Sequence, residues 1–159
     1  MGEVTVNFDW KNNQEAIKRE LTKVSKDMTF ELTQTIYASL MERIFNFTKD
    51  SSGKKFGKYK SLSYKRKREQ AGRQISNKDL QFSGLLKNSV KVGNLDDNTF
   101  AIGIIPSKHK DKADSANISV FQEEQLKAKI FVPSDKEIQK AEAKVIEKYI
   151  KKRSNILTK

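Results

Sequence analysis

The sequence predicts an α+β fold in which a long N-terminal helix and a C-terminal helix pack on a small antiparallel sheet, with a basic extended loop. Three patterns lead to this class. Residues 13–48 lack Gly and Pro and repeat apolar residues at helical spacing, two short alternating runs flank a turn-rich spacer, and a capping box opens a last helical run. A length of 159 residues suits a single domain spanning 1–159.

The N-terminal elements come first. Residues 4–8 alternate apolar and polar side chains, which is the period of a half-buried strand, and residues 9–13 indicate a turn. The helix that follows is roughly 35 residues, or about 50 Å, long, with Asn12 or Asn13 as its cap. Its apolar stripe consists of Ile17, Leu21, Val24, Met28, Leu32, Ile36, Leu40, Ile44 and Phe47.

A helix of this length is longer than one small domain can cover with its own chain. Two shorter helices with a kink near residues 28–30 are the alternative, and they would not imply an oligomer by themselves. If the helix is continuous, we expect part of its stripe to bind an adjacent subunit through Ile36, Leu40, Ile44 and Phe47.

A basic arm follows at residues 51–78. Residues 51–92 carry 12 basic and 2 acidic groups, a net charge of +10, within a chain whose net charge is +12. Glycines and isolated apolar residues predict a loop or extended arm with a short helix near residues 63–70. The cations expected to contact a partner or DNA are Lys54, Lys55, Lys58, Lys60, Lys65, Arg66, Lys67, Arg68 and Arg73.

The next segments are short. Residues 80–86 indicate a turn or helix start, and apolar residues at 90–92 and 100–104 flank a turn-rich spacer, which predicts a β-hairpin. Residues 106–115 are polar and predict a flexible loop. Residues 116–125 then predict a short helix with three side chains turned inward, namely Ile118, Val120 and Phe121.

The C-terminal part is expected to hold a strand and a helix. Residues 128–132 predict a last strand, which Pro133 ends. Ser134 and Glu137 have the spacing of a capping box, so a helix should begin there. Its apolar positions are Ile138, Ala141, Val145, Ile146, Tyr149 and Ile150.

The composition removes several classes of chemistry. With no cysteine there is no disulfide framework, thiolate nucleophile or cysteine-based zinc site, and a single histidine excludes a multi-histidine metal centre. No apolar run approaches the roughly 20 residues that cross a bilayer, and the first residues lack the layout of a secretory signal. We therefore expect a protein made and kept in a cytoplasm, or in something assembled there.

Side chains suited to catalysis are few. His109 lies between two lysines in a polar loop, with Asp111 as its one nearby carboxylate, which is not an oriented catalytic group. The pairs 96–97 and 123–124 are acidic and would suit magnesium in a nuclease, although a hairpin tip and a helix end favour such residues for structural reasons. We expect no enzyme activity, no cofactor and no metal.

The basic arm interleaves its cations with Phe56, Tyr59 and Tyr64, a composition typical of nucleic-acid surfaces. Non-specific contact with nucleic acid, contact with an acidic protein surface, and solubility alone all stay open as interpretations. A small basic nucleic-acid-binding protein is therefore the alternative function.

The order of motifs resembles the virion morphogenesis and tail-completion proteins, the head–tail joining factors of long-tailed bacteriophages. Residues 57–67 are similar to a family segment that runs from glycine through an aromatic residue and Leu-Ser to basic residues. Residues 80–90 are similar to a second family segment, the Ser-Gly-x-Leu-x-x-Ser block. Residues 116–122 and 130–133 are similar in kind and order to later segments. The motif positions are Leu62, Ser63, Ser83, Gly84, Leu85 and Ser89.

This resemblance implies a structural virion protein that forms a homo-oligomeric ring, commonly a hexamer, at the neck or tail end. Its partners would be copies of itself, neck or portal-connector proteins, and tail-tube or tail-terminator proteins, with no membrane. It would be assembled into the virion in the host cytoplasm. We expect the basic arm to order on contact with the neck, the tail tube or packaged DNA.

Overall fold

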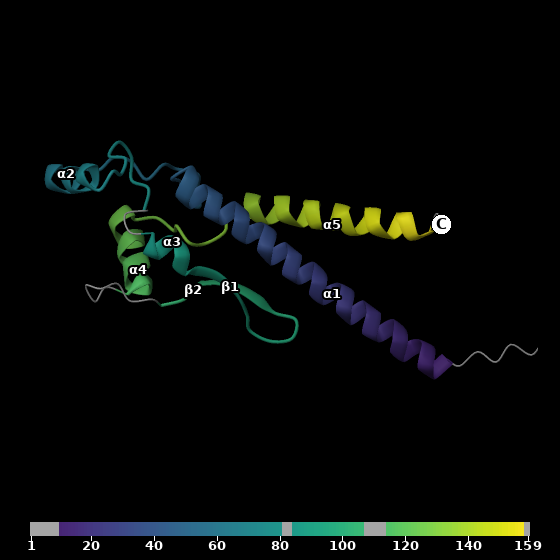
Figure 1. The fold of residues 1–159 in the computed structure, drawn as a ribbon. Helices are drawn as coiled ribbons and strands as arrows, with labels where there is room; N and C mark the ends of the chain where they lie inside the picture. The colour runs from purple at the N-terminus through teal and green to yellow at the C-terminus, as the bar shows by residue number, and fades with distance from the viewer. Residues whose placement is uncertain (1–9, 81–83, 107–113, 158–159) are drawn as a thin grey trace, which may run out of the picture.

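The computed structural model describes residues 10–80, 84–106 and 114–157. Its long α1 and α5 accompany a two-stranded antiparallel sheet, which confirms the predicted α+β class (Figure 1). The predicted strand at residues 4–8 lies outside the described residues. The elements are α1 (Trp10–Met41), a π-helical turn (Glu42–Asn46), α2 (Leu62–Gln70), α3 (Leu85–Ser89), β1 (Val90–Asn94), β2 (Phe100–Ile104), α4 (Ser115–Leu126) and α5 (Asp135–Leu157).

Helix α1 runs without a break through residues 28–30, so the alternative of two helices is wrong. It begins at Trp10, inside the predicted turn, because residues 10–13 contain no Gly or Pro that would stop the helix from extending. None of the helices in the described part of the chain is long and apolar enough to cross a membrane.

A π-helical turn ends the first helix, where the amide of Phe47 donates to the carbonyl of Glu42 at 3.0 Å. Three consecutive side chains, Arg43, Ile44 and Phe45, are buried there. In an α-helix three neighbours span about 200° of the surface, so one of them would normally face solvent. The wider turn, together with segments packed on several sides, places all three inside.

The core lies where the end of α1 meets the hairpin, the base of the basic arm and the segment after α4. Leu40 and Ile44 are completely buried in it, so the prediction that they bind an adjacent subunit is wrong, because their own chain covers them. Ile36 is partly buried and Phe47 is about half exposed. The buried core residues are Leu40, Ile44, Phe45, Phe56, Val90 and Ile130.

The hairpin forms as predicted, with Val90 opposite Ile104 and Asn94 opposite Phe100. It packs against α1, where the rings of Phe30 and Phe100 lie 5.2 Å apart between centroids. Helix α5 also packs against α1, and Figure 1 shows α1 between α5 and the hairpin. Helix α1 is therefore the element that joins the two halves of the fold.

The predicted strand at residues 128–132 is wrong, because side chains satisfy the backbone that a neighbouring strand would have paired. The Glu123 carboxylate accepts from the amides of Ile130 at 2.7 Å and Phe131 at 3.0 Å. The Arg43 guanidinium donates to the carbonyls of Ile130 at 3.1 Å and Val132 at 2.8 Å. The apolar pattern arises because Ile130 fills the core.

Helix α4 forms as predicted, and of the three side chains predicted to turn inward only Ile118 is partly buried. Val120 and Phe121 are 56% and 54% exposed, so the prediction that they turn inward is wrong. The buried side chains are Ser115 and Ser119, whose hydroxyls donate to the carbonyls of Ile105 at 3.1 Å and Ala116 at 2.7 Å. These small residues let α4 pack closely on α3.

The capping box at the start of α5 is confirmed. The Ser134 amide donates to the Glu137 carboxylate at 2.7 Å, and the Glu137 amide donates to the Ser134 hydroxyl at 3.3 Å. The same carboxylate binds the Arg43 Nε at 2.9 Å. The beginning of α5 is thereby joined to the end of α1.

Candidate functional site

The basic arm emerges from the core at one end of the molecule, where Figure 1 shows α2 beyond the end of α1. Its base is anchored by Phe56, which is buried and whose amide donates to the carbonyl of Thr48 at 2.9 Å. Its two ends are joined where the Lys78 amide donates to the carbonyl of Gly57 at 2.9 Å. The φ of +82° at Gly57 explains why the chain has glycine at this bend.

The base of the arm also contains a structured turn around Asp50. This buried carboxylate accepts from the Ser52 amide at 2.9 Å, the Ser52 hydroxyl at 2.7 Å and the Lys54 amide at 2.9 Å. Burial alone would raise the pKa of Asp50, but these hydrogen bonds outweigh burial and leave the pKa lowered. Asp50 is therefore a turn-forming residue, and its carboxylate is occupied.

The interior of the arm is polar. Arg68 is completely buried, and its guanidinium binds the two carboxylate oxygens of Asp79 at 2.7 and 3.0 Å. Its Nε donates to the Gln74 carbonyl at 2.8 Å, and its guanidinium carbon lies 4.7 Å from the centre of the Tyr59 ring. We call Tyr59, Arg68, Gln74 and Asp79 the polar centre of the arm.

Tyr59 completes the polar centre by donating its hydroxyl proton to Asp79 at 3.0 Å. Burial raises the pKa of Tyr59 to about 12, and the negative charge of Asp79 adds to this rise. Tyr59 is therefore a neutral phenol in the folded arm.

The arm should lose stability at alkaline pH. Because the pKa of Tyr59 in the folded protein lies above its ordinary value of 10.0, its contribution is complete below pH 10 and is lost as the pH rises towards about 12. A spectrophotometric titration of tyrosinate should show a late step that Tyr59→Phe removes. If all four tyrosines titrated together near their ordinary pKa, Tyr59 would not be buried and hydrogen-bonded in the polar centre.

The arm therefore differs from the prediction in two ways. Arg68 is not a contact residue, because it is buried and paired, and the segment is folded around it without needing a partner to order it. Asp79 is one of two acidic residues within 51–92, and this isolation was the signal in the sequence that marked it as a partner for a buried cation. The predicted cations at the surface are Lys54, Lys55, Lys58, Lys60, Lys65, Arg66, Lys67 and Arg73.

The motif positions have two different environments. Leu62 is 72% exposed on α2, and the Ser63 hydroxyl is hydrogen-bonded to that of Ser61. Gly84, at a φ of +77°, precedes α3, and the buried Ser89 donates to the Leu86 carbonyl at 2.9 Å. Leu85 begins α3, and Ser83 lies outside the described residues. The second motif thus joins α3 to the hairpin, whereas the first lies on the arm.

One member of each acidic pair has structural partners. Asp96 accepts from the amides of Asn98 at 2.9 Å and Thr99 at 2.8 Å, which closes the hairpin turn and lowers the pKa of Asp96. Glu123 holds the segment after α4. Across the described ranges, no three His, Cys, Asp or Glu side chains gather to hold a metal ion. His109 lies outside these ranges.

Two exposed apolar surfaces were not predicted as contact sites. The first, which we call the fork, is a mainly apolar groove between α1 and α5. Its lining residues are Leu21, Val24, Met28, Leu32, Val145 and Ile146, together with Ser25, Thr29 and Glu142. The second is the outward face of α4, with Val120 and Phe121. The stripe on α1 had indicated a contact surface, but the free part lies towards its N-terminus.

No family model, curated protein or solved structure matches this chain.

Proposed function

We propose that this protein is a structural subunit of a ring at the head–tail junction or tail end of a long-tailed phage virion, where it completes the tail and joins it to the portal or connector. The observation that carries the proposal is the separation of two kinds of association surface on one chain. A folded basic arm lies at one end of α1, and the apolar fork lies towards the other (Figure 1).

The apolar surfaces support self-assembly. Ile17, Leu21 and Ile150 are 60%, 54% and 63% exposed, and they lie on the two longest helices of the described chain. Contiguous exposed aliphatic side chains mark association surfaces in soluble proteins, because water disfavours them. A ring subunit needs such surfaces.

The charge of the arm supports an anionic neighbour. A ring would bring many copies of a chain with net charge +12 together, and their mutual repulsion opposes assembly unless anions lie opposite. The arm presents eight of its nine predicted cations on a unit that its polar centre already holds in shape. Acidic surfaces of neighbouring rings or packaged DNA would supply the opposite charge.

The first test is the native mass by light scattering, at low and high salt and with and without duplex DNA. A ring of six 18.3 kDa chains has a mass of about 110 kDa. That discrete species, or one that forms only with a virion partner, is the expected result. A monomer that binds DNA at low salt and never assembles would instead favour the nucleic-acid-binding alternative.

The second test changes the arm. Replacing four of its exposed cations, Lys58, Lys60, Arg66 and Lys67, with Ser should leave a folded ring that fails to join heads to tails. The control replaces exposed cations on α1 and α5 and removes the same charge without touching the arm. Its residues are Arg19, Lys23, Lys136 and Lys140. Normal infectious particles from the arm variant, or equal loss from both, would contradict a docking role for the arm.

A further inference from the structure

We infer that copies of this chain bind head to tail, with the α4 face of one copy, Val120 and Phe121, seated in the fork between α1 and α5 of the next. This inference rests on the proposed self-assembly and names the two surfaces that would carry it.

Two ion pairs hold α5 against α1, and the α5 residues of the fork, Val145 and Ile146, lie between them along the helix. Glu137 at the start of α5 binds Arg43, and Lys148 in its middle binds Glu31 at 2.5 Å. Figure 1 shows the two helices diverging beyond that point, towards the N-terminus of α1. Every side chain from residue 14 to residue 23 is accordingly exposed.

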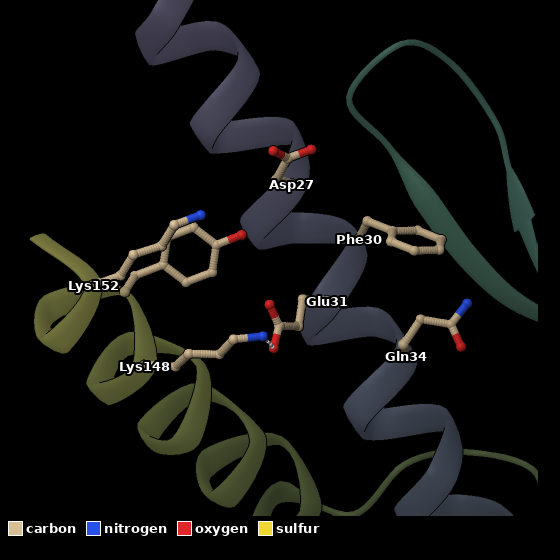
Figure 2. A pocket seen from close by; sticks show the side chains of 7 residues that line it. Asp27, Phe30, Glu31, Gln34, Lys148 and Lys152 are labelled. Atoms are coloured by element: carbon tan, nitrogen blue, oxygen red, sulfur yellow. Dashed lines mark hydrogen bonds and ion pairs between the residues drawn. The ribbon is translucent and has the colours of Figure 1, made fainter.

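The two sides of this helix pair differ. Figure 2 shows the polar side, where Lys148 reaches from α5 to Glu31 on α1. Asp27, Gln34 and Lys152 line this hollow, together with the rings of Phe30 and Tyr149. The fork is on the apolar side, where α1 contributes Leu21 and Met28 among others. The charged contacts hold the pair together and leave the apolar groove open to a third element.

Helix α4 has the polarity of that third element. Its Leu126 packs against the core and its Ser115 and Ser119 are buried, but Val120 and Phe121 are exposed on another face of the helix. Phenylalanine is an effective anchor at an interface because one ring buries a large apolar area. The outward face of α4 therefore presents apolar side chains suited to a groove.

Charge favours a second copy in this orientation. Residues 93–135, which include α4, carry 5 basic and 7 acidic groups, whereas residues 136–159, which include most of α5, carry 8 and 3. A head-to-tail contact brings these opposite net charges together. A two-fold contact of fork against fork would instead place two positively charged α5 helices side by side and repel.

The placement of the two surfaces also agrees with a ring. Figure 1 shows α4 near the end of the molecule that also holds α2, whereas α1 and α5, which line the fork, extend away from that end. A contact between two different surfaces is heterologous, and repeating it closes a ring when the rotation between neighbours divides a full turn. The basic arm lies outside both surfaces and is left free for another partner.

Single cysteines test this contact cleanly, because the chain has none of its own. Mixing Val120→Cys chains with Ile146→Cys chains under mild oxidation should give a disulfide-linked dimer that neither variant gives alone. Both positions are about half exposed, so the fold should tolerate them. Lys23→Cys, on the polar side of α1, is the control and should not link to Val120→Cys.

Assembly provides the second readout. Val120→Asp and Ile146→Asp should each shift the native mass from the oligomer to the 18.3 kDa monomer. If the wild-type chain assembles but the cysteines do not link and the Asp variants keep the full mass, this contact is wrong while the ring stands. A dimer of Ile146→Cys alone would indicate the two-fold contact instead. A wild-type monomer under every condition would overturn both proposals.

Discussion

Replacing Arg43 with Ala is expected to lower the free energy of unfolding by about 3–5 kcal/mol, which is typical when one partner of a buried ion pair is removed. Arg43 and Glu137 are 9% and 12% exposed at their side chains. The guanidinium also donates to three carbonyls, those of Lys49, Ile130 and Val132. The variant leaves the largely covered Glu137 carboxylate without its cation, and the three carbonyls lose the donor that Arg43 supplied.

Chemical denaturation of wild-type and variant measures this loss, provided that both unfold in one transition. Arg43→Lys is the matched control, since it keeps the charge but has one nitrogen in place of three. We expect its stability to lie between the two, because it can meet Glu137 or a carbonyl but not all of them. A loss below about 1 kcal/mol for Arg43→Ala would mean that this residue is not the joint between α1 and α5.

Replacing Asp79 with Ala should open the basic arm while leaving the core folded. The change leaves Arg68, which is completely buried, without the carboxylate that neutralises its charge. Removing one member of such a pair costs about 3–5 kcal/mol. Here the loss should fall on the arm, because α2 has no extensive contact with another helix or strand of the described chain. Amide protection in α2 should therefore fall by roughly 100- to 5,000-fold.

Hydrogen exchange resolved by peptide, together with limited trypsin digestion, distinguishes local opening from global unfolding. Glu69→Ala is the matched control, because Glu69 is the other acidic residue of this stretch and is exposed. The control should keep protection in α2 and resist cleavage. Unchanged protection in Asp79→Ala would refute the polar centre, and equal loss in α1 would show that the arm does not fold as a separate unit.

The same variant informs the proposed function. Asp79→Ala keeps all of the surface cations and raises the net charge, so a partner that needed charge alone would bind it at least as well. If docking requires the folded arm, Asp79→Ala should fail to join heads to tails although it still forms the ring. This variant therefore separates the contribution of the arm's charge to docking from the contribution of its folded shape.

Local patterns in the sequence were sufficient for most of the secondary structure. The helical repeat without Gly or Pro predicted α1, and Ser134 with Glu137 predicted the start of α5. The alternating runs around a spacer predicted the hairpin at residues 90–104. Each of these features depends on residues within a few positions of one another, so no knowledge of distant contacts was needed.

Only the tertiary structure decided which residues are exposed and available to bind a partner. Leu40 and Arg68 were predicted to contact partners, yet both are completely buried, because residues that are distant in sequence cover the first and Asp79 neutralises the second. Val120 was predicted to turn inward and faces solvent. The pattern of apolar and charged residues predicts whether a side chain needs burial or a charged partner. Which residues cover it or pair with it depends on how distant segments pack. Composition, charge and helix periods were thus determined by the sequence alone, and the surfaces available for binding were determined by long-range packing.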